Sequence, residues 1–110
     1  KDGGREVPRA ERVPDHVVNV PLDPGSDRDR FRSAFNQALP TLERFAPDII
    51  FLSAGFDAHA QDPLGGSSNH GLQLVEDDFF WITQTLSSLA HSLCNGRVIS
   101  VLEGGYDPAV

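Results

Sequence analysis

Two short apolar runs constrain the fold of this chain more than any other feature. Ile49–Leu52 is apolar without polar alternation, which is typical of a strand buried on both faces in a parallel sheet, and Arg97–Leu102 is a second strand-like run. A helical pattern separates them, because the apolar residues between them recur at steps of three and four: Phe79, Ile82, Leu86, Leu89 and Leu93. A strand, a helix and a strand in this order predict a parallel pair joined by a crossover helix.

The residues upstream predict one more strand and one more helix. Val17–Val20 is a β-branched run closed by Pro21, and we expect a strand there. A helix should follow, with Ser26 or Asp27 as its N-cap and with an apolar face at Phe31, Phe35, Leu39, Leu42 and Phe45. Pro40 lies inside this pattern and should kink or split the helix.

The predicted fold class is therefore α/β, a parallel sheet with crossover helices. If three strands pair in sequence order, right-handed crossovers place both helices on one face of the sheet and leave the other face uncovered. Parallel sheets ordinarily have both faces covered. We therefore expect residues 17–110 to be the C-terminal part of a larger domain, preceded by a polar loop or excursion at residues 1–16.

Composition excludes some functions. The 110 residues carry a net charge of −7, which argues against binding the phosphate backbone of nucleic acids. No apolar run approaches the ~20 residues that a membrane span needs. The single cysteine, Cys94, permits no disulfide within the chain and favours a reducing, intracellular compartment. We therefore expect neither a direct nucleic-acid partner nor a membrane partner.

Two reactive side chains follow the predicted strands. Asp57 comes after the first run, in Ser53-Ala54-Gly55-Phe56-Asp57-Ala58-His59, and Tyr106 comes after the second, in Leu102-Glu103-Gly104-Gly105-Tyr106-Asp107. The carboxyl ends of parallel strands meet at one edge, where open α/β sheets bind their ligands. Without further information, such an acid is more often a helix cap and such a tyrosine more often a packing residue. The Asp57-x-His59 pair could also supply two metal ligands from one loop.

These segments, together with Asn19-Val20-Pro21-Leu22 and Asp62-Pro63-Leu64-Gly65, resemble the C-terminal part of the zinc-dependent histone deacetylase superfamily. The Glu103-Gly104-Gly105-Tyr106 version is similar to its class II and bacterial amidohydrolase branch. The resemblance implies the C-terminal portion of an arginase/deacetylase-like fold, and it covers about four-fifths of the chain.

The resemblance also implies roles for individual residues. Asp57 would be a Zn²⁺ ligand, and the Tyr106 hydroxyl would donate to the acyl carbonyl of the substrate. His59 would be a loop or supporting residue and not a ligand. Leu64 would lie on the rim of an acyl-lysine tunnel, where the polyamine-deacetylating branch has a glutamate. The expected substrate-binding residues are Gly55, Phe56, Leu64, Gly104 and Gly105.

Under this resemblance the chain would be part of a zinc-dependent enzyme that hydrolyses acetyl-lysine or longer acyl-lysine amides on a histone or another protein, in the nucleus or the cytoplasm. The paired catalytic histidines and the Asp-x-His zinc ligands of the family pattern have no match in the sequence, so we expect the chain alone to be inactive and to need the remainder of the catalytic domain as a partner. A non-catalytic, deacetylase-like binding or scaffolding module is the alternative. A nucleotide-binding domain is a weaker one, because no Gly-x-Gly-x-x-Gly follows a strand.

Overall fold

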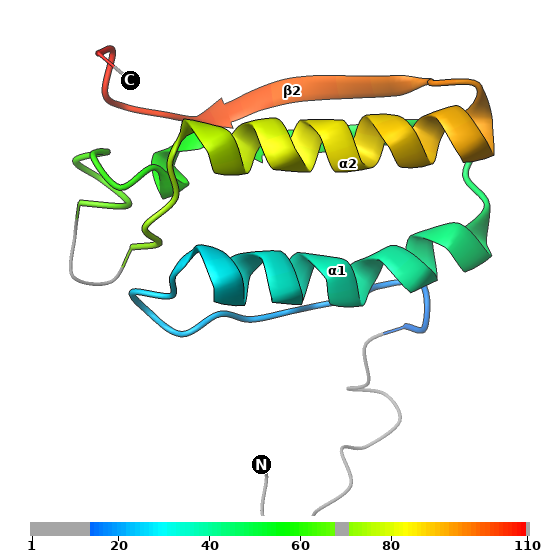
Figure 1. The fold of residues 1–110 in the computed structure, drawn as a ribbon, viewed down its shortest axis with the longest axis horizontal. Coiled ribbons are helices and arrows are strands. Elements are labelled where there is room, and N and C mark those ends of the chain that lie inside the picture. Colours follow the sequence, from blue (N-terminus) through cyan, green and yellow to red (C-terminus); the bar gives the residue numbers. More distant parts are fainter. Residues whose placement is uncertain (1–13, 68–70, 110) are drawn as a thin grey trace, which may run out of the picture.

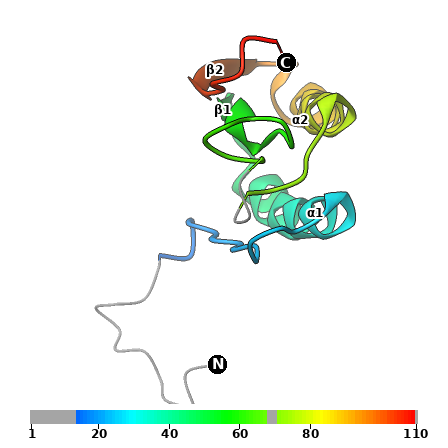
Figure 2. The same ribbon diagram turned by 90° about the vertical axis from the view of Figure 1, so that its left-hand side faces the viewer.

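The computed structural model describes residues 14–67 and 71–109. In chain order, these residues form helix α1 (Arg28–Phe45), strand β1 (Ile50–Gly55), the short 3-10 helix η2 (Phe56–Ala58), helix α2 (Glu76–Cys94) and strand β2 (Val98–Gly104). The strands form one layer, and α2 runs beside them with α1 next to it (Figure 1). Turned by 90°, the molecule shows both helices on the same side of the strands (Figure 2).

Strands β1 and β2 pair in parallel, as the sequence predicts. Ile50 pairs with Val98, and the register continues in step to Ala54 and Leu102. An irregularity then follows, so that Gly55 pairs with Gly104 and Glu103 is skipped. Because the strands are parallel, the loops that carry Asp57 and Tyr106 leave the sheet at the same edge.

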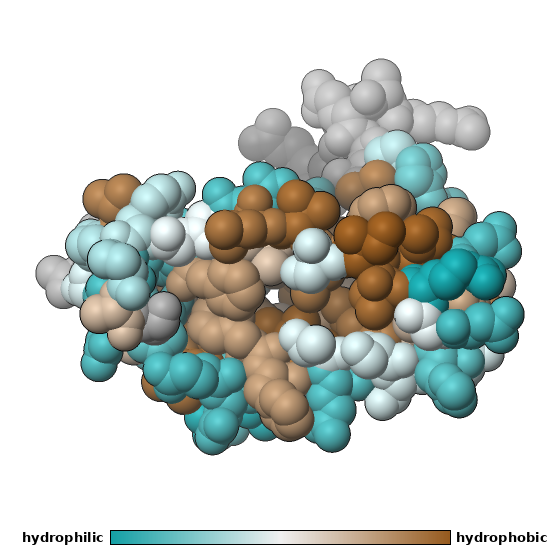
Figure 3. All heavy atoms as spheres, turned by 90° about the horizontal axis from the view of Figure 1, so that it is seen from above, coloured by the Kyte–Doolittle hydropathy of each residue, from teal (hydrophilic) through white to brown (hydrophobic). Residues whose placement is uncertain are grey.

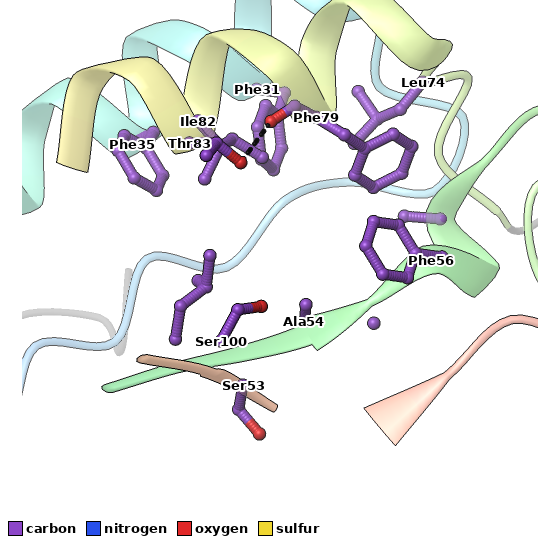
Figure 4. A pocket seen from close by; sticks show the side chains of 13 residues that line it. Phe31, Phe35, Ser53, Ala54, Phe56, Leu74, Phe79, Ile82, Thr83 and Ser100 are labelled. Carbon is purple, nitrogen blue, oxygen red and sulfur yellow. Dashed lines mark hydrogen bonds between the residues drawn. The ribbon is translucent and has the colours of Figure 1, made fainter. Parts of the chain in front are cut away.

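A small apolar core joins the sheet to the helices. Ile50 of β1 is buried against Ala90 and Cys94 of α2, with Leu42 of α1 and Val98 of β2 partly buried around them. Cys94 is the last residue of α2, and its thiol is buried and free. An apolar pocket of about 320 Å³ continues this layer between the helices and the sheet (Figure 4).

The predicted strand at Val17–Val20 is wrong. In the part of the chain that the structure describes, the sheet has two strands, and residues 17–20 form neither a strand nor a bridge. The β-branched run remains largely exposed, since a strand needs a hydrogen-bonding neighbour as well as β propensity. The described residues therefore form one β1–α2–β2 unit, preceded in the chain by α1, and not the predicted three-stranded sheet.

Of the kink or split predicted at Pro40, the split does not occur, because α1 runs without interruption from Arg28 to Phe45. Pro40 deprives the carbonyl of Asn36 of its helical partner, but both residues are exposed and water can satisfy that carbonyl. Asp27 is the N-cap, as one of the two predicted candidates, and its side chain accepts from the Arg30 N–H at 3.0 Å.

One buried carboxylate ties the two helices together. Asp78, in the first turn of α2, accepts from the Val75 N–H at 2.9 Å. The same carboxylate lies 2.8 Å from Arg28 Nε and 3.0 Å from Arg32 Nη2, both on α1. Burial alone would raise the pKa of Asp78, but the Val75 N–H and the two guanidinium groups outweigh that effect and lower it.

The face of the sheet remote from the helices is uncovered in the described residues. Phe51, Ile99 and Val101 are exposed there, and Ser53 points away from the helices while Ser100 and Ala54 point toward them (Figure 4). Viewed from the β2 side, hydrophobic side chains gather in the middle of the molecule, with hydrophilic ones around them (Figure 3). Within the described residues, none of the helices combines the length and the apolar character that crossing a membrane requires.

Candidate active site

The two predicted functional loops leave the sheet side by side. Gly55 and Gly104 are paired at the ends of β1 and β2, and Asp57 and Tyr106 each follow two residues later. A β-carbon on Gly105 would lie 3.1 Å from Cβ of Phe56, so the backbones of the two loops are in close contact. The structure therefore places the predicted ligand and the predicted hydroxyl donor at one edge of the sheet.

The carboxylate of Asp57 lies in a cradle of two glycines. Asp57 is half-buried in η2, and a β-carbon on Gly55 would come within 2.9 Å of its Oδ1. A β-carbon on Gly104 would come within 2.7 Å of the same oxygen. Only glycine at both strand ends leaves room for this carboxylate. The Asp57 backbone carbonyl accepts from the Gly66 N–H at 2.9 Å, which fixes η2 to the following loop.

Tyr106 follows a turn that requires glycine. Gly105 has a φ of +131°, in the region that side chains with a β-carbon rarely adopt. Tyr106 is 52% exposed. The Tyr106 backbone N–H donates to Oδ2 of Asp62 at 2.6 Å, so the tyrosine loop is anchored although its side chain is free to make contacts.

Asp62 lies in one of the segments that carry the family resemblance, but the sequence analysis assigned it no role. It is only 2% exposed, and its Oδ1 accepts from the Leu64 N–H at 2.9 Å. Burial alone would raise the pKa of Asp62, but hydrogen bonds from the backbone N–H groups of four residues outweigh it and hold the pKa below its usual value: Tyr106, Leu64, Asp107 and Gly65. The signal in the sequence was an Asp followed by Pro and Leu, which is typical of an Asx turn.

The remaining predicted substrate-binding residues line the same edge. The Phe56 ring lies 5.1 Å from that of Phe79 on α2, centroid to centroid. Leu64 is 71% exposed at the tip of the Asp62–Gly65 loop. A pocket of about 170 Å³ opens between the two loops, lined by Phe56, His59, Asp62, Leu102, Gly104, Gly105 and Asp107.

His59 is buried with both ring nitrogens engaged. Its Nδ1 accepts from the Gln61 N–H at 3.1 Å, and its Nε2 lies 3.0 Å from Oε1 of Glu76. Since Nδ1 is an acceptor, Nε2 carries a hydrogen and donates a hydrogen bond to Oε1 of Glu76. The pKa of Glu76 is lowered by its own backbone N–H and by this hydrogen bond. These contacts suit a supporting residue and leave no nitrogen for a metal.

The other histidines lie away from this edge or outside the described residues. His91 is exposed near the end of α2, and His16 is exposed before α1. His70 lies outside the described residues. Among residues 14–67 and 71–109, no group of three or more His, Cys, Asp or Glu side chains could hold a metal ion. Asp57 therefore does not form a complete metal site with other described residues.

Comparison with known proteins identifies the family. A profile of the histone deacetylase domain matches residues 2–110. The chain is 51% identical over 92 residues to type-2 histone deacetylase 2 of Dictyostelium discoideum, covering 83% of this chain and 5% of that protein. It is 41% identical over 93 residues to the histone deacetylase-like amidohydrolase of Pseudomonas aeruginosa, covering 84% of this chain and 23% of that one. The chain belongs to the histone deacetylase family.

The fold agrees with this assignment. The crystal structure of an acetylpolyamine aminohydrolase from Burkholderia pseudomallei superposes on 81% of this chain and 23% of its own, with a TM-score of 0.66 and 32% identity. The similarity to a bacterial amidohydrolase and to type-2 deacetylases supports the predicted branch of the superfamily. The chain spans less than a quarter of the length of these relatives.

Proposed function

We propose that this chain contributes one edge of the active site of a zinc-dependent deacetylase that hydrolyses acetyl-lysine amides. The observation that carries the proposal is the convergence of Asp57 and Tyr106 at the paired strand ends Gly55 and Gly104. The protein substrate would be a histone or another acetylated protein in the nucleus or the cytoplasm. The remaining ligands and the general acid and base would come from other segments of the catalytic domain.

Asp57 would hold the metal, and Tyr106 would act on the substrate. The two glycines leave room for the carboxylate between the ends of the paired strands. Zinc, when bound, would supply Lewis-acid chemistry and lower the pKa of a bound water to about 7. The exposed Tyr106 hydroxyl would donate a hydrogen bond to the acyl oxygen as negative charge develops on it. Donors of this kind accelerate reactions by about 100- to 1000-fold.

Leu64 supports lysine in place of a polyamine as the substrate backbone. Its exposed, uncharged side chain at the loop tip offers an apolar contact to the methylene chain of a lysine and no negative charge to a second amine. The structurally similar acetylpolyamine aminohydrolase makes the polyamine the natural competitor in an assay. Leu64→Glu should shift the kcat/KM ratio toward an acetylpolyamine if this assignment holds.

The deciding experiment measures turnover of an acetylated lysine peptide by the full-length protein with zinc. Turnover that disappears with a chelator and returns with zinc supports the proposal. A folded, zinc-loaded protein that releases no acetate would reject it. In that case the exposed sheet residues Phe51, Ile99 and Val101 favour the second candidate, a non-catalytic binding module.

A further inference from the structure

Asp62 is an unusual buried acid because its partners are backbone amides. Among the described residues, no Lys or Arg forms an ion pair with it, although it is only 2% exposed. An isolated buried charge is costly unless hydrogen bonds compensate it. The Asp62 carboxylate accepts backbone hydrogen bonds from two loops that are far apart in the sequence. This arrangement indicates that Asp62 does more than cap its own turn.

The two carboxylate oxygens divide between the loops. Oδ1 accepts from the Leu64 N–H at 2.9 Å, within the loop of Asp62 itself. Oδ2 accepts from the Tyr106 N–H at 2.6 Å, a separation of 44 residues along the chain. We call the unit of Leu64 N–H, Asp62 carboxylate and Tyr106 N–H the Asp62 bridge. It joins the loop tip at Leu64 directly to the backbone of Tyr106.

The main chain of Asp62 is held equally firmly. Its N–H donates to the His59 carbonyl at 3.0 Å, and its carbonyl accepts from the Ser67 N–H at 2.9 Å. The carboxylate therefore acts as a fixed point on the η2 side of the site. The tyrosine loop has less support of its own, since Gly104 and Gly105 both precede Tyr106 and glycine restricts the backbone least.

We propose that Asp62 is a positioning residue, whose bridge sets the backbone position of Tyr106 and aligns its hydroxyl with the acyl oxygen. This proposal rests on the function proposed above for Tyr106. The role needs a carboxylate, because the amides that converge on Asp62, those of Leu64 and Tyr106 among them, are all donors. An asparagine of the same shape would turn an NH₂ group toward one of them and lose that bond.

The principal test is Asp62→Asn in the full-length zinc-loaded enzyme, assayed with an acetylated lysine peptide. Because a hydrogen bond to a charged group corresponds to about 10- to 100-fold, we expect kcat to fall within that range. KM and zinc content should stay the same, since neither depends on the hydroxyl donated in the transition state. Unchanged kcat would overturn the proposal, as would loss of zinc in proportion to activity.

A double mutant separates positioning of Tyr106 from a general structural effect. In a Tyr106→Phe background, Asp62→Asn should cost less than about twofold further, because residues that act through one another are not additive. Equal losses in both backgrounds would contradict the proposal. Asp78→Asn is the matched control, because it alters another buried carboxylate that accepts a backbone N–H. It should lower the unfolding midpoint while kcat of the folded enzyme remains normal.

Amide hydrogen exchange of Tyr106 tests the bridge without an activity measurement. The Tyr106 N–H should be protected in the wild-type protein despite its exposed side chain, and Asp62→Asn should remove that protection. A Tyr106 amide that exchanges freely in the wild type overturns the proposal even if Asp62→Asn fails to fold. If the bridge is present but Tyr106→Phe leaves kcat unchanged, the proposed role of Tyr106 fails and the positioning role fails with it.

Discussion

Oδ1 of Asp57 occupies the space that a β-carbon on Gly104 would need, at a separation of 2.7 Å. The contact links the end of β2 to the 3-10 helix that follows β1. It explains the first glycine of the Gly-Gly-Tyr segment, whereas the second is explained by the φ of +131° at Gly105. The two glycines therefore serve different purposes.

Gly104→Ala should displace the Asp57 carboxylate and reduce metal affinity. The backbone at Gly104 is not in the left-handed region, so the steric contact alone should cause the effect. We expect about 10- to 100-fold weaker zinc binding in the full-length enzyme, as for loss of a residue that orients a metal ligand. Titration of the apo enzyme with zinc measures it. His91→Ala, at an exposed position near the end of α2, is the control.

Asp57→Ala and Tyr106→Phe should differ in what they remove. Asp57→Ala deletes a proposed ligand, so zinc content and activity should fall together. Tyr106→Phe deletes one hydroxyl and should keep zinc and KM while kcat falls about 100- to 1000-fold. Elemental analysis and steady-state rates measure both, with the exposed His91→Ala as a control. A Tyr106→Phe enzyme without metal would show that these roles are misassigned.

Asp78→Asn should destabilise the fold by about 1–3 kcal/mol at pH 7, the cost of leaving buried hydrogen-bond groups without their charged partner. The pKa of Asp78 is lowered in the folded state, so its stabilisation is complete above the unfolded pKa of about 3.9 and disappears as the pH falls through the lower folded value. Urea unfolding should be measured at about pH 7 and about pH 2.5. The difference in unfolding free energy between wild type and variant should be smaller at the acidic pH. A constant difference would mean that the Asp78 charge is irrelevant.

The uncovered sheet face should make the 110-residue chain bind a hydrophobic dye or self-associate. Phe51 is 65% exposed there, beside Ile99 and Val101. Replacing Phe51 and Val101 with Ser and Thr should lower dye fluorescence and sedimentation coefficient. Phe80→Ser, which removes an equally exposed phenylalanine from α2, should have a smaller effect. A wild-type chain that is monomeric and binds no dye would contradict this expectation.

The elements that the sequence predicted well are those with an internal signal. β1, α2 and β2 have apolar runs or a long helical period, and Asp57 and Tyr106 follow strands whose parallel pairing brings them to one edge. The strand predicted at Val17–Val20 is absent because strand formation depends on a hydrogen-bonding neighbour, which a local sequence pattern cannot reveal. The split expected at Pro40 does not occur, because the effect of a proline depends on whether the freed carbonyl meets water, which is a property of the folded surface.

The reactive side chains of the site could be predicted from the sequence, but the contacts that hold the site in place could not. Residues with reactive side chains stood out at the strand ends, but the partners of Asp62 and His59 did not. Asp62 binds an amide 44 positions away, and the proton of His59 is assigned by contacts to Gln61 and Glu76. Neither relationship has a spacing that a single sequence can display.

The skipped pairing at Glu103 has a consequence for how this segment can vary. Since Ala54 pairs with Leu102 and Gly55 with Gly104, Glu103 is one extra residue that brings the two loops level with each other. Its side chain accepts only from Ser53 Oγ, at 2.6 Å on the exposed face, among the hydrogen bonds of the described residues. The identity of residue 103 is therefore open to exchange, whereas its deletion would withdraw Tyr106 by one step from Asp57. Chain length at this point, more than chemistry, keeps the edge of the sheet in alignment.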